Sequence, residues 1–162
     1  MTEPLPVRIA DLPQLRLAYF EQRGSIEEVQ LAWDRLNDWR AERRPALGRI
    51  DIAALGWYTT EHTPDGEIVV LRAGVPVRGA YRVEPPARVT LFNPRRFVYA
   101  HAGDGDAYAA AFAAVAAHIE RDGLAPEDAE LDAAEVHSYH FNLDQHPADC
   151  GYLLPGEVQP SG

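Results

Sequence analysis

The pattern of hydrophobic and polar residues predicts two helices, each preceded by one strand. These strands span 15–22 and 95–102, and each ends close to a glycine suited to a tight turn, Gly24 or Gly103. A helix follows each glycine, because apolar residues then recur at intervals of three and four and form one stripe. The stripe of the first helix is Ile26, Val29, Ala32, Trp33, Leu36 and Trp39, and that of the second is Tyr108, Ala111, Phe112, Val115 and Ile119.

Capping residues mark where these helices begin and end. Ser25 and Glu28 form an S-x-x-E capping box, in which each side chain bonds a backbone N–H of the other residue. Asp104 or Asp106 can cap the second helix, and Gly123 can end it because glycine adopts positive φ. Both helices therefore have defined boundaries in the sequence.

Two further strand-like runs follow each helix. After the first helix they span 50–60 and 67–77, with the turn sequence TPDG at 63–66 between them. After the second helix they span 131–143 and 150–154. Shorter strands are expected at 7–10 and 88–92.

The two halves of the chain match each other when one is shifted by 79 residues. Gly24 then falls on Gly103, Pro76 falls on Pro155, and the apolar stripes of the two helices coincide. Any two amphipathic helices share such a stripe, but a glycine and a proline at the same offset favour an internal duplication.

One α+β domain over residues 1–162 is the fold that this duplication predicts. It consists of tandem βαββ units with one long helix per unit, pseudo-twofold symmetry, and antiparallel sheets that form a central cleft. The first repeat is expected at about 7–78, a linker with one strand at about 79–94, and the second repeat at about 95–157. A single unit buries only a small core, which favours pairing of the two.

Charge is distributed unevenly along the chain. Its 162 residues include 15 basic and 25 acidic side chains, with a formal net charge of −10. Residues 1–97 hold 14 arginines and 13 carboxylates, whereas residues 98–162 hold one arginine and 12 carboxylates. An acidic half repels phosphate groups, so neither nucleic acid nor an anionic membrane surface is an expected partner. A cationic ligand or a basic protein surface is favoured instead.

Several common kinds of site have no counterpart in the sequence. There is no apolar run long enough to span a membrane and no signal peptide, so the cytoplasm is the expected compartment. The single cysteine, Cys150, excludes an internal disulfide and a multi-cysteine metal site. No histidine pair has the i, i+4 spacing of a zinc-binding helix, and no phosphate-binding loop or serine-hydrolase motif occurs. Neither a metal nor a cofactor is therefore expected.

The strand near the C-terminus carries the most suggestive side chains. Alternation places Glu135, His137 and Tyr139 on one of its faces. The corresponding strand of the first half has Gly56 at the position equivalent to Glu135, so a carboxylate in one half corresponds to an empty position in the other. A carboxylate among aromatic rings stabilises a bound cation through its charge and the ring quadrupoles. The alternative for Glu135 is a surface position at a sheet edge.

Other aromatic residues are candidates for the same cleft. Val98, Ala100 and Ala102 are expected to face the helices, so the residues that alternate with them face away from the helices, toward the cleft. Tryptophans of the first helix can form a cleft wall, although core packing is the commoner role. The candidate ligand contacts are Glu135, His137, Tyr139, Tyr58, Trp57, Tyr99, His101, Phe97 and Trp39.

Five segments, in this order and spacing, resemble the gyrase-inhibitor-like (GyrI-like) domain, which is also the effector-binding domain of AraC-type and MerR-type regulators. They are 15–39, Thr63-Pro64, RAGVPV at 72–77, PRRFVYAHAG at 94–103 and YLLP at 152–155. The likeness covers about residues 7–157.

This resemblance implies a duplicated βαββ fold and a cleft for lipophilic, often cationic, drug-like molecules. Counted back from Pro155, Glu135 matches the glutamate that reaches into the cleft of such domains. His137 stands where tyrosine is usual, and Arg72 stands where relatives commonly carry aspartate. An arginine near the cleft would weaken the preference for cations, or it would pair with Glu135. The two units use the whole chain, so a stand-alone member without a DNA-binding segment is expected.

Three functions remain open at this point. The first is capture of a small organic ligand, with Glu135 as counter-charge. The second is hydrolysis of strained electrophilic natural products, with Glu135 as general base and His137 or Tyr139 as proton donor. The third is inhibition of a protein partner by the acidic second half. The carboxylates that would act in it are Asp104, Asp106, Glu127, Asp128 and Glu130.

Overall fold

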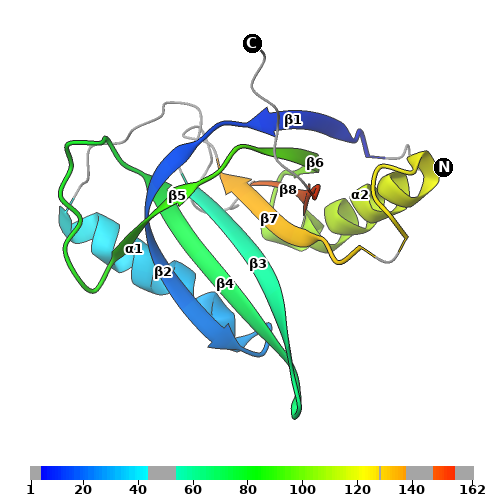
Figure 1. Cartoon of the computed structure of the whole chain (residues 1–162). Coiled ribbons are helices and arrows are strands. Elements are labelled where there is room, and N and C mark those ends of the chain that lie inside the picture. Colours follow the sequence, from blue (N-terminus) through cyan, green and yellow to red (C-terminus); the bar gives the residue numbers. More distant parts are fainter. Residues whose placement is uncertain (1–4, 44–53, 128, 138–147, 156–162) are drawn as a thin grey trace.

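The computed structural model describes residues 5–43, 54–127, 129–137 and 148–155 (Figure 1). The strands are β1 (Arg8–Leu12), β2 (Leu15–Gly24), β3 (Ala54–Thr63), β4 (Gly66–Pro76), β5 (Arg88–Phe92), β6 (Arg95–Ala102), β7 (Asp132–His137) and β8 (Ala148–Leu153). The helices are α1 (Leu31–Arg43) and α2 (Tyr108–Asp122), which the short 3₁₀ turns Glu28–Gln30 and Gly105–Ala107 precede. None of the helices in these ranges is long and apolar enough to cross a membrane.

All eight strands belong to one curled antiparallel sheet with the order β1-β6-β8-β7-β3-β4-β2-β5. From the centre outwards, one side of the sheet is β3, β4, β2 and β5, and the other side is β7, β8, β6 and β1. Each helix lies in the sequence between one strand and the next two, as the hydrophobic pattern predicts. The α+β class is thus confirmed, and each expected strand has a counterpart in the structure. The sequence predicted more than one sheet, whereas the described strands form one, and residues 138–143 of the expected strand 131–143 lie outside the described residues.

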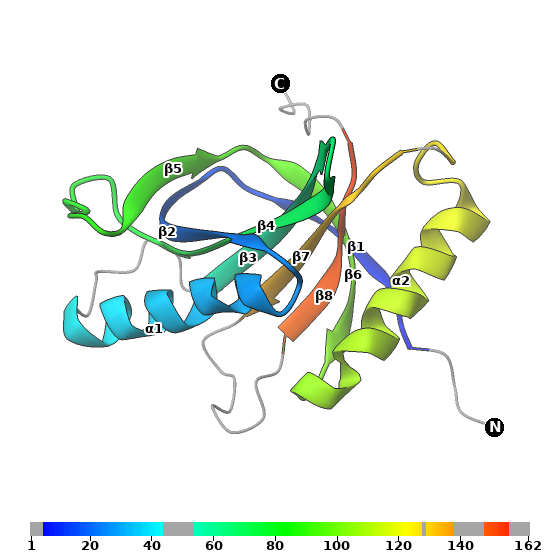
Figure 2. The same ribbon diagram turned by 90° about the horizontal axis from the view of Figure 1, so that it is seen from below.

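Both helices pack on the same face of the sheet, as Figure 2 shows. Under α1, the stripe residues Val29, Ala32 and Leu36 contact β2 and β4. Under α2, the stripe residues Ala111 and Val115 contact β6 and β8 in a separate cluster. A third cluster lies on the opposite face of the sheet. It includes Leu15, Leu17, Leu55, Phe92, Phe97, Val136 and Leu153.

The predicted helix caps are present. The Ser25 hydroxyl accepts a hydrogen bond from the Glu28 backbone N–H, and the Glu28 carboxylate accepts one from the Ser25 N–H, both at 3.2 Å. Asp104, rather than Asp106, caps the second helical segment, since its side chain accepts from the Ala107 N–H at 3.1 Å. Gly123 ends α2 at a φ of 64°, which glycine adopts without strain.

Strands β6 and β8 approach each other unusually closely at Gly151. A Cβ atom at this position would lie 1.8 Å from the carbonyl oxygen of Val98 and 2.7 Å from the Cα of Tyr99. Only a residue without a side chain therefore allows β8 to pair with β6 at this separation.

His62, at the end of β3, joins two parts of the sheet through carboxylates. Its Nδ1 lies 3.4 Å from Glu67 and its Nε2 lies 3.0 Å from Glu130, which precedes β7. The hydrogen bond and the charge of Glu130 raise the pKa of His62. Because the folded-state pKa exceeds the unfolded one, the protonated imidazole stabilises the fold at low pH, and this contribution is lost as pH rises through the folded-state pKa.

We expect His62→Gln to lower the melting temperature at pH 6 and to leave it nearly unchanged at pH 8.5. Thermal unfolding of both proteins across this pH range measures the difference. Because the side chains are exposed, 0.5 M NaCl should reduce the effect at pH 6. An equal change at both pH values would contradict the charge-based explanation.

Candidate functional site

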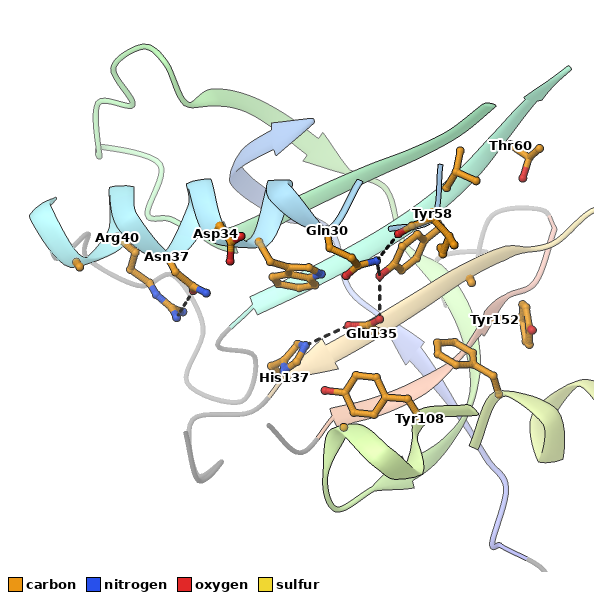
Figure 3. Close-up of a pocket in the computed structure, with 17 residues that line it drawn as sticks. Gln30, Asp34, Asn37, Arg40, Tyr58, Thr60, Tyr108, Glu135, His137 and Tyr152 are labelled. Atoms are coloured by element: carbon orange, nitrogen blue, oxygen red, sulfur yellow. Dashed lines mark hydrogen bonds and ion pairs between the residues drawn. The ribbon is translucent and has the colours of Figure 1, made fainter. Parts of the chain in front are cut away.

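A cavity of about 1070 Å³ lies between α1 and α2, above the central strands β3 and β7 (Figure 3). The two helices form opposite walls and the strands form the floor. Five aromatic side chains line it, from four different elements. They are Trp33, Tyr58, Tyr108, Phe112 and Tyr152.

The floor of the cavity follows from the pairing of β3 with β7. Gly56 lies opposite Glu135, and Ala54 lies opposite His137. Because side chains alternate along a strand, Tyr58 shares the helix-facing side with Glu135 and His137. Three of the residues selected from the sequence are therefore brought together at this floor.

Glu135 is buried, with 7 % of its surface exposed, and is the only buried charged residue of the described chain. The Tyr58 hydroxyl donates a hydrogen bond to its Oε1 at 2.9 Å. The Nε2 of His137 lies 3.5 Å from its Oε2. Burying an ionised carboxylate is costly unless opposite charges or donors surround it, so a further donor or a positive charge in the cavity would stabilise Glu135.

The hydroxyl of Tyr58 lies between Glu135 and Gln30. Gln30, in the 3₁₀ turn that precedes α1, donates to this hydroxyl at 3.3 Å, so the polar groups form a chain from this turn to the sheet (Figure 3). Burial, followed by the Glu135 charge, raises the pKa of Tyr58. The same two causes raise the pKa of Tyr108 on the other wall. Both phenols therefore stay protonated and can donate hydrogen bonds.

Trp33 occupies the space above Gly56. A Cβ atom on Gly56 would lie 2.3 Å from Cζ2 of Trp33, so the indole rests directly on the glycine backbone. The ring also meets His137 edge to face, with centroids 5.0 Å apart. The sequence predicted an empty position here. Instead, the missing side chain lets a tryptophan reach the floor and form part of the cavity wall.

Gly56→Ala is expected to reduce the free energy of unfolding by about 1–3 kcal/mol, because the methyl group overpacks the contact with Trp33. Denaturant unfolding measures this loss. Trp33→Leu in the same chain removes the clash, so the double variant should cost less than the sum of the two single changes. Additive losses would show that Gly56 acts independently of Trp33.

The two helical walls differ in chemistry. The α1 wall presents Asp34, Asn37 and Arg40, and the Arg40 guanidinium donates to the Asn37 side chain at 3.0 Å. The α2 wall presents Tyr108 and Phe112. A ligand that fills the cavity thus meets polar groups together with Trp33 on the α1 side, and aromatic rings on the α2 side.

The other residues selected from the sequence lie elsewhere. Trp57 and Phe97 are on the opposite face of the sheet, since the cavity occupies the helix-facing side rather than the other one. Tyr99 stacks on Phe97 on that same face. His101 is exposed and lies 2.9 Å from Asp149, and Trp39 is buried in the core under α1. Tyr139 lies outside the described residues.

Arg72 also differs from the expectation, because it does not meet Glu135. Its Nε lies 2.9 Å from the Glu21 carboxylate, on the face of the sheet away from the helices. Arg72 pairs in register with Trp57, which shares that face, whereas Glu135 faces the helices.

Several cavity residues were treated as core positions in the sequence. Trp33, Tyr108 and Phe112 belong to the apolar helical stripes, but each lies at the edge of its stripe and is only partly buried. The sequence did contain a signal for these cavity residues. Each stripe has large aromatic residues at its edge, beside small residues such as alanine at its centre. No group of three or more potential metal ligands occurs among the described residues.

An open, mostly apolar cavity with a few convergent polar groups is typical of small-molecule-binding proteins, and here it is built on an α+β domain with a curled sheet. A comparison of the sequence with family models agrees. The chain belongs to the GyrI-like small molecule binding domain family, whose model matches residues 5–135.

Solved structures with the same fold are distant in sequence. SAV2435 bound to tetraphenylphosphonium has a TM-score of 0.61 and 13 % identity, over 94 % of this chain and 95 % of that one. A putative transcription regulation protein from Staphylococcus aureus MU50 has a TM-score of 0.59 and 12 % identity, over 94 % and 99 %. The EcmrR C-terminal domain has a TM-score of 0.54 and 10 % identity, over 95 % and 99 %. Among curated proteins, no sequence matches this chain.

Proposed function

We propose that this domain binds a lipophilic organic cation in the cavity between α1 and α2, with Glu135 as its counter-charge. The observation that carries this proposal is the buried carboxylate of Glu135 at the floor of an aromatic cavity of about 1070 Å³. The volume is sufficient for a drug-sized molecule.

The chemistry of the walls supports a cation in preference to an anion. A cation that enters an apolar site loses its hydration, and a carboxylate together with aromatic ring faces replaces part of that interaction. Glu135 and Asp34 are both in the lining, and Tyr58, Tyr108 and Phe112 supply ring faces. Arg40 lies at the α1 wall, where its guanidinium is bonded to Asn37.

Tetraphenylphosphonium is a suitable probe because SAV2435, which shares the fold, has been solved with it bound. Tetraphenylborate has nearly the same shape and the opposite charge, so the pair separates charge from size. Isothermal titration calorimetry should show at least tenfold tighter binding of the cation, equivalent to about 1.4 kcal/mol. Equal affinities, or a preference for the anion, would overturn the proposal.

Hydrolysis is a second candidate function, which the contacts of Glu135 favour. The carboxylate can accept a proton from an attacking water, while His137 at 3.5 Å or the Tyr58 hydroxyl at 2.9 Å is placed to donate one to a leaving atom. Incubation with an excess of a strained, ring-containing electrophile distinguishes the two functions. An enzyme forms more than one equivalent of product, whereas a binding protein forms none.

Inhibition of a protein partner depends on a different surface. Asp104, Asp106, Glu127 and Glu130 are exposed, and Asp128 lies outside the described residues. Reversing these charges to arginine should abolish capture of a basic partner without changing cation binding in the cavity. We keep this function as an alternative. For either function we also propose a cytoplasmic location.

We also propose that the domain arose by tandem duplication of a βαββ unit. The strand orders β3-β4-β2-β5 and β7-β8-β6-β1 on the two sides of the sheet centre support it, as does the position of one helix in each half. In this interpretation a pseudo-twofold axis passes between β3 and β7, where the cavity lies.

A further inference from the structure

The face of the sheet away from the helices contains a second, smaller hollow of about 550 Å³. Tyr19, Trp57 and Phe92 contribute its aromatic rings, and Arg72 and Arg95 contribute its charges. The hollow shares β3 with the main cavity, because Trp57 and Tyr58 are consecutive residues and point to opposite faces. The two sites are therefore separated by the thickness of the sheet.

The charged side chains that line this hollow differ from those that line the main cavity. Its charged lining consists of two arginines, whose side chains are 28 % and 25 % exposed, and it includes no carboxylate. The charged side chains that line the main cavity are, in contrast, two carboxylates and one guanidinium, from Glu135, Asp34 and Arg40. All residues of the hollow come from the part of the sequence before residue 98, which is nearly neutral, whereas the acidic surplus lies after it.

Each of the two arginines already has one carboxylate partner in the protein. Arg72 uses Nε for Glu21 at 2.9 Å and Nη1 for Thr59 at 3.4 Å. Arg95 contacts Asp132 at 3.6 Å and donates to the carbonyl oxygens at 153 and 154. Among the described residues, Nη2 of Arg72 has no hydrogen-bond acceptor, so it is available to an oxygen of a ligand.

The aromatic rings form one continuous group beside these guanidinium groups. The Trp57 ring centroid is 5.5 Å from that of Phe92 and 6.4 Å from that of Tyr19. Thr90 and Asn93 add polar groups to the lining. A flat aromatic molecule with one anionic group matches this combination, because its ring can pack on Trp57 while the anion meets Arg72.

We propose that this hollow is a second ligand site, which binds a small aromatic carboxylate. The carboxylate accepts a hydrogen bond from Nη2 of Arg72, and the ring packs against Trp57 and Phe92. The proposal does not depend on cation binding in the main cavity, since the two hollows share no lining residue.

The three tryptophans of the chain provide a test with the unmodified protein, because each lies in a different place. Trp57 lines the second hollow, Trp33 lines the main cavity, and Trp39 is buried in the core. In a titration with 2-naphthoate, followed by NMR of the indole N–H signals, the Trp57 signal should shift and saturate while the Trp39 and Trp33 signals stay in place. The neutral 2-naphthamide should bind at least tenfold more weakly.

A variant tests the role of the guanidinium. Glu21→Gln with Arg72→Gln removes the ion pair without leaving one charge buried alone, and should weaken 2-naphthoate binding about tenfold. Glu135→Gln should leave it unchanged. The proposal is overturned if the amide binds as well as the carboxylate, if Trp33 responds instead of Trp57, or if Glu135→Gln changes binding while the double variant does not. These outcomes are independent of tetraphenylphosphonium binding.

Discussion

Replacing Glu135 by glutamine should weaken tetraphenylphosphonium binding by roughly 10- to 150-fold, which corresponds to about 1.5–3 kcal/mol for a lost interaction with a charged group. Glutamine keeps nearly the same shape and can still accept the hydrogen bond from Tyr58, so the cavity retains its form. Only the negative charge at the floor is removed. Calorimetric titration of both proteins with the same cation measures the loss.

Glu120→Gln is the matched control for this change. Glu120 is an exposed residue of α2, outside the cavity, and the substitution removes the same charge from the protein as a whole. Its affinity for the cation should stay within about twofold of the wild type, because exposed charges are screened by salt and solvent. If both variants lose affinity equally, long-range attraction by the acidic protein explains the binding, and Glu135 has no special role.

Gly151→Ala should have the largest effect on stability, with a loss of about 3 kcal/mol or more. The new methyl group would meet backbone atoms of Val98 and Tyr99, which cannot rotate away as a side chain can. Strands β6 and β8 must then separate, and their hydrogen bonds weaken. Denaturant unfolding followed by circular dichroism gives the free energy of unfolding.

The control for this variant is Gly103→Ala, since a Cβ at Gly103 would have no neighbour within 4 Å. That change should alter the free energy of unfolding by less than about 1 kcal/mol. A Gly151→Ala protein as stable as this control would mean that the two strands can adopt a wider spacing at little cost. The close approach would then not be a requirement of the fold.

The elements of the fold could be predicted from the sequence because each has a local signal. The apolar stripes set the positions of α1 and α2, and Ser25, Asp104 and Gly123 fix where the helical segments begin or end. Hydrophobic alternation also placed Val98 and Ala100 toward a helix, as the core under α2 confirms. The succession of strands in the sheet has no such local signal, since it depends on contacts between distant segments.

The candidate site could be predicted only in part. Strand parity and the family resemblance placed Glu135 and His137 together, and Tyr58 joined them through the pairing of β3 with β7. The alternation of side chains along a strand shows which residues share a face of the sheet, but not which face holds the cavity. Trp57 and Tyr99 were therefore assigned to the cleft although they lie on the other face. Which helical residues line the cavity depends on the distance between α1 and α2, and no local sequence pattern predicts that distance.

Each of the two helices packs on a separate hydrophobic core. Asn37 on α1 and Phe112 on α2 line the cavity but lie outside the fully buried stripes that hold each helix on the sheet. Substitutions at these positions can change which molecule is bound while the packing that determines folding is conserved. Either wall of the cavity can therefore vary without altering the core beneath the other helix.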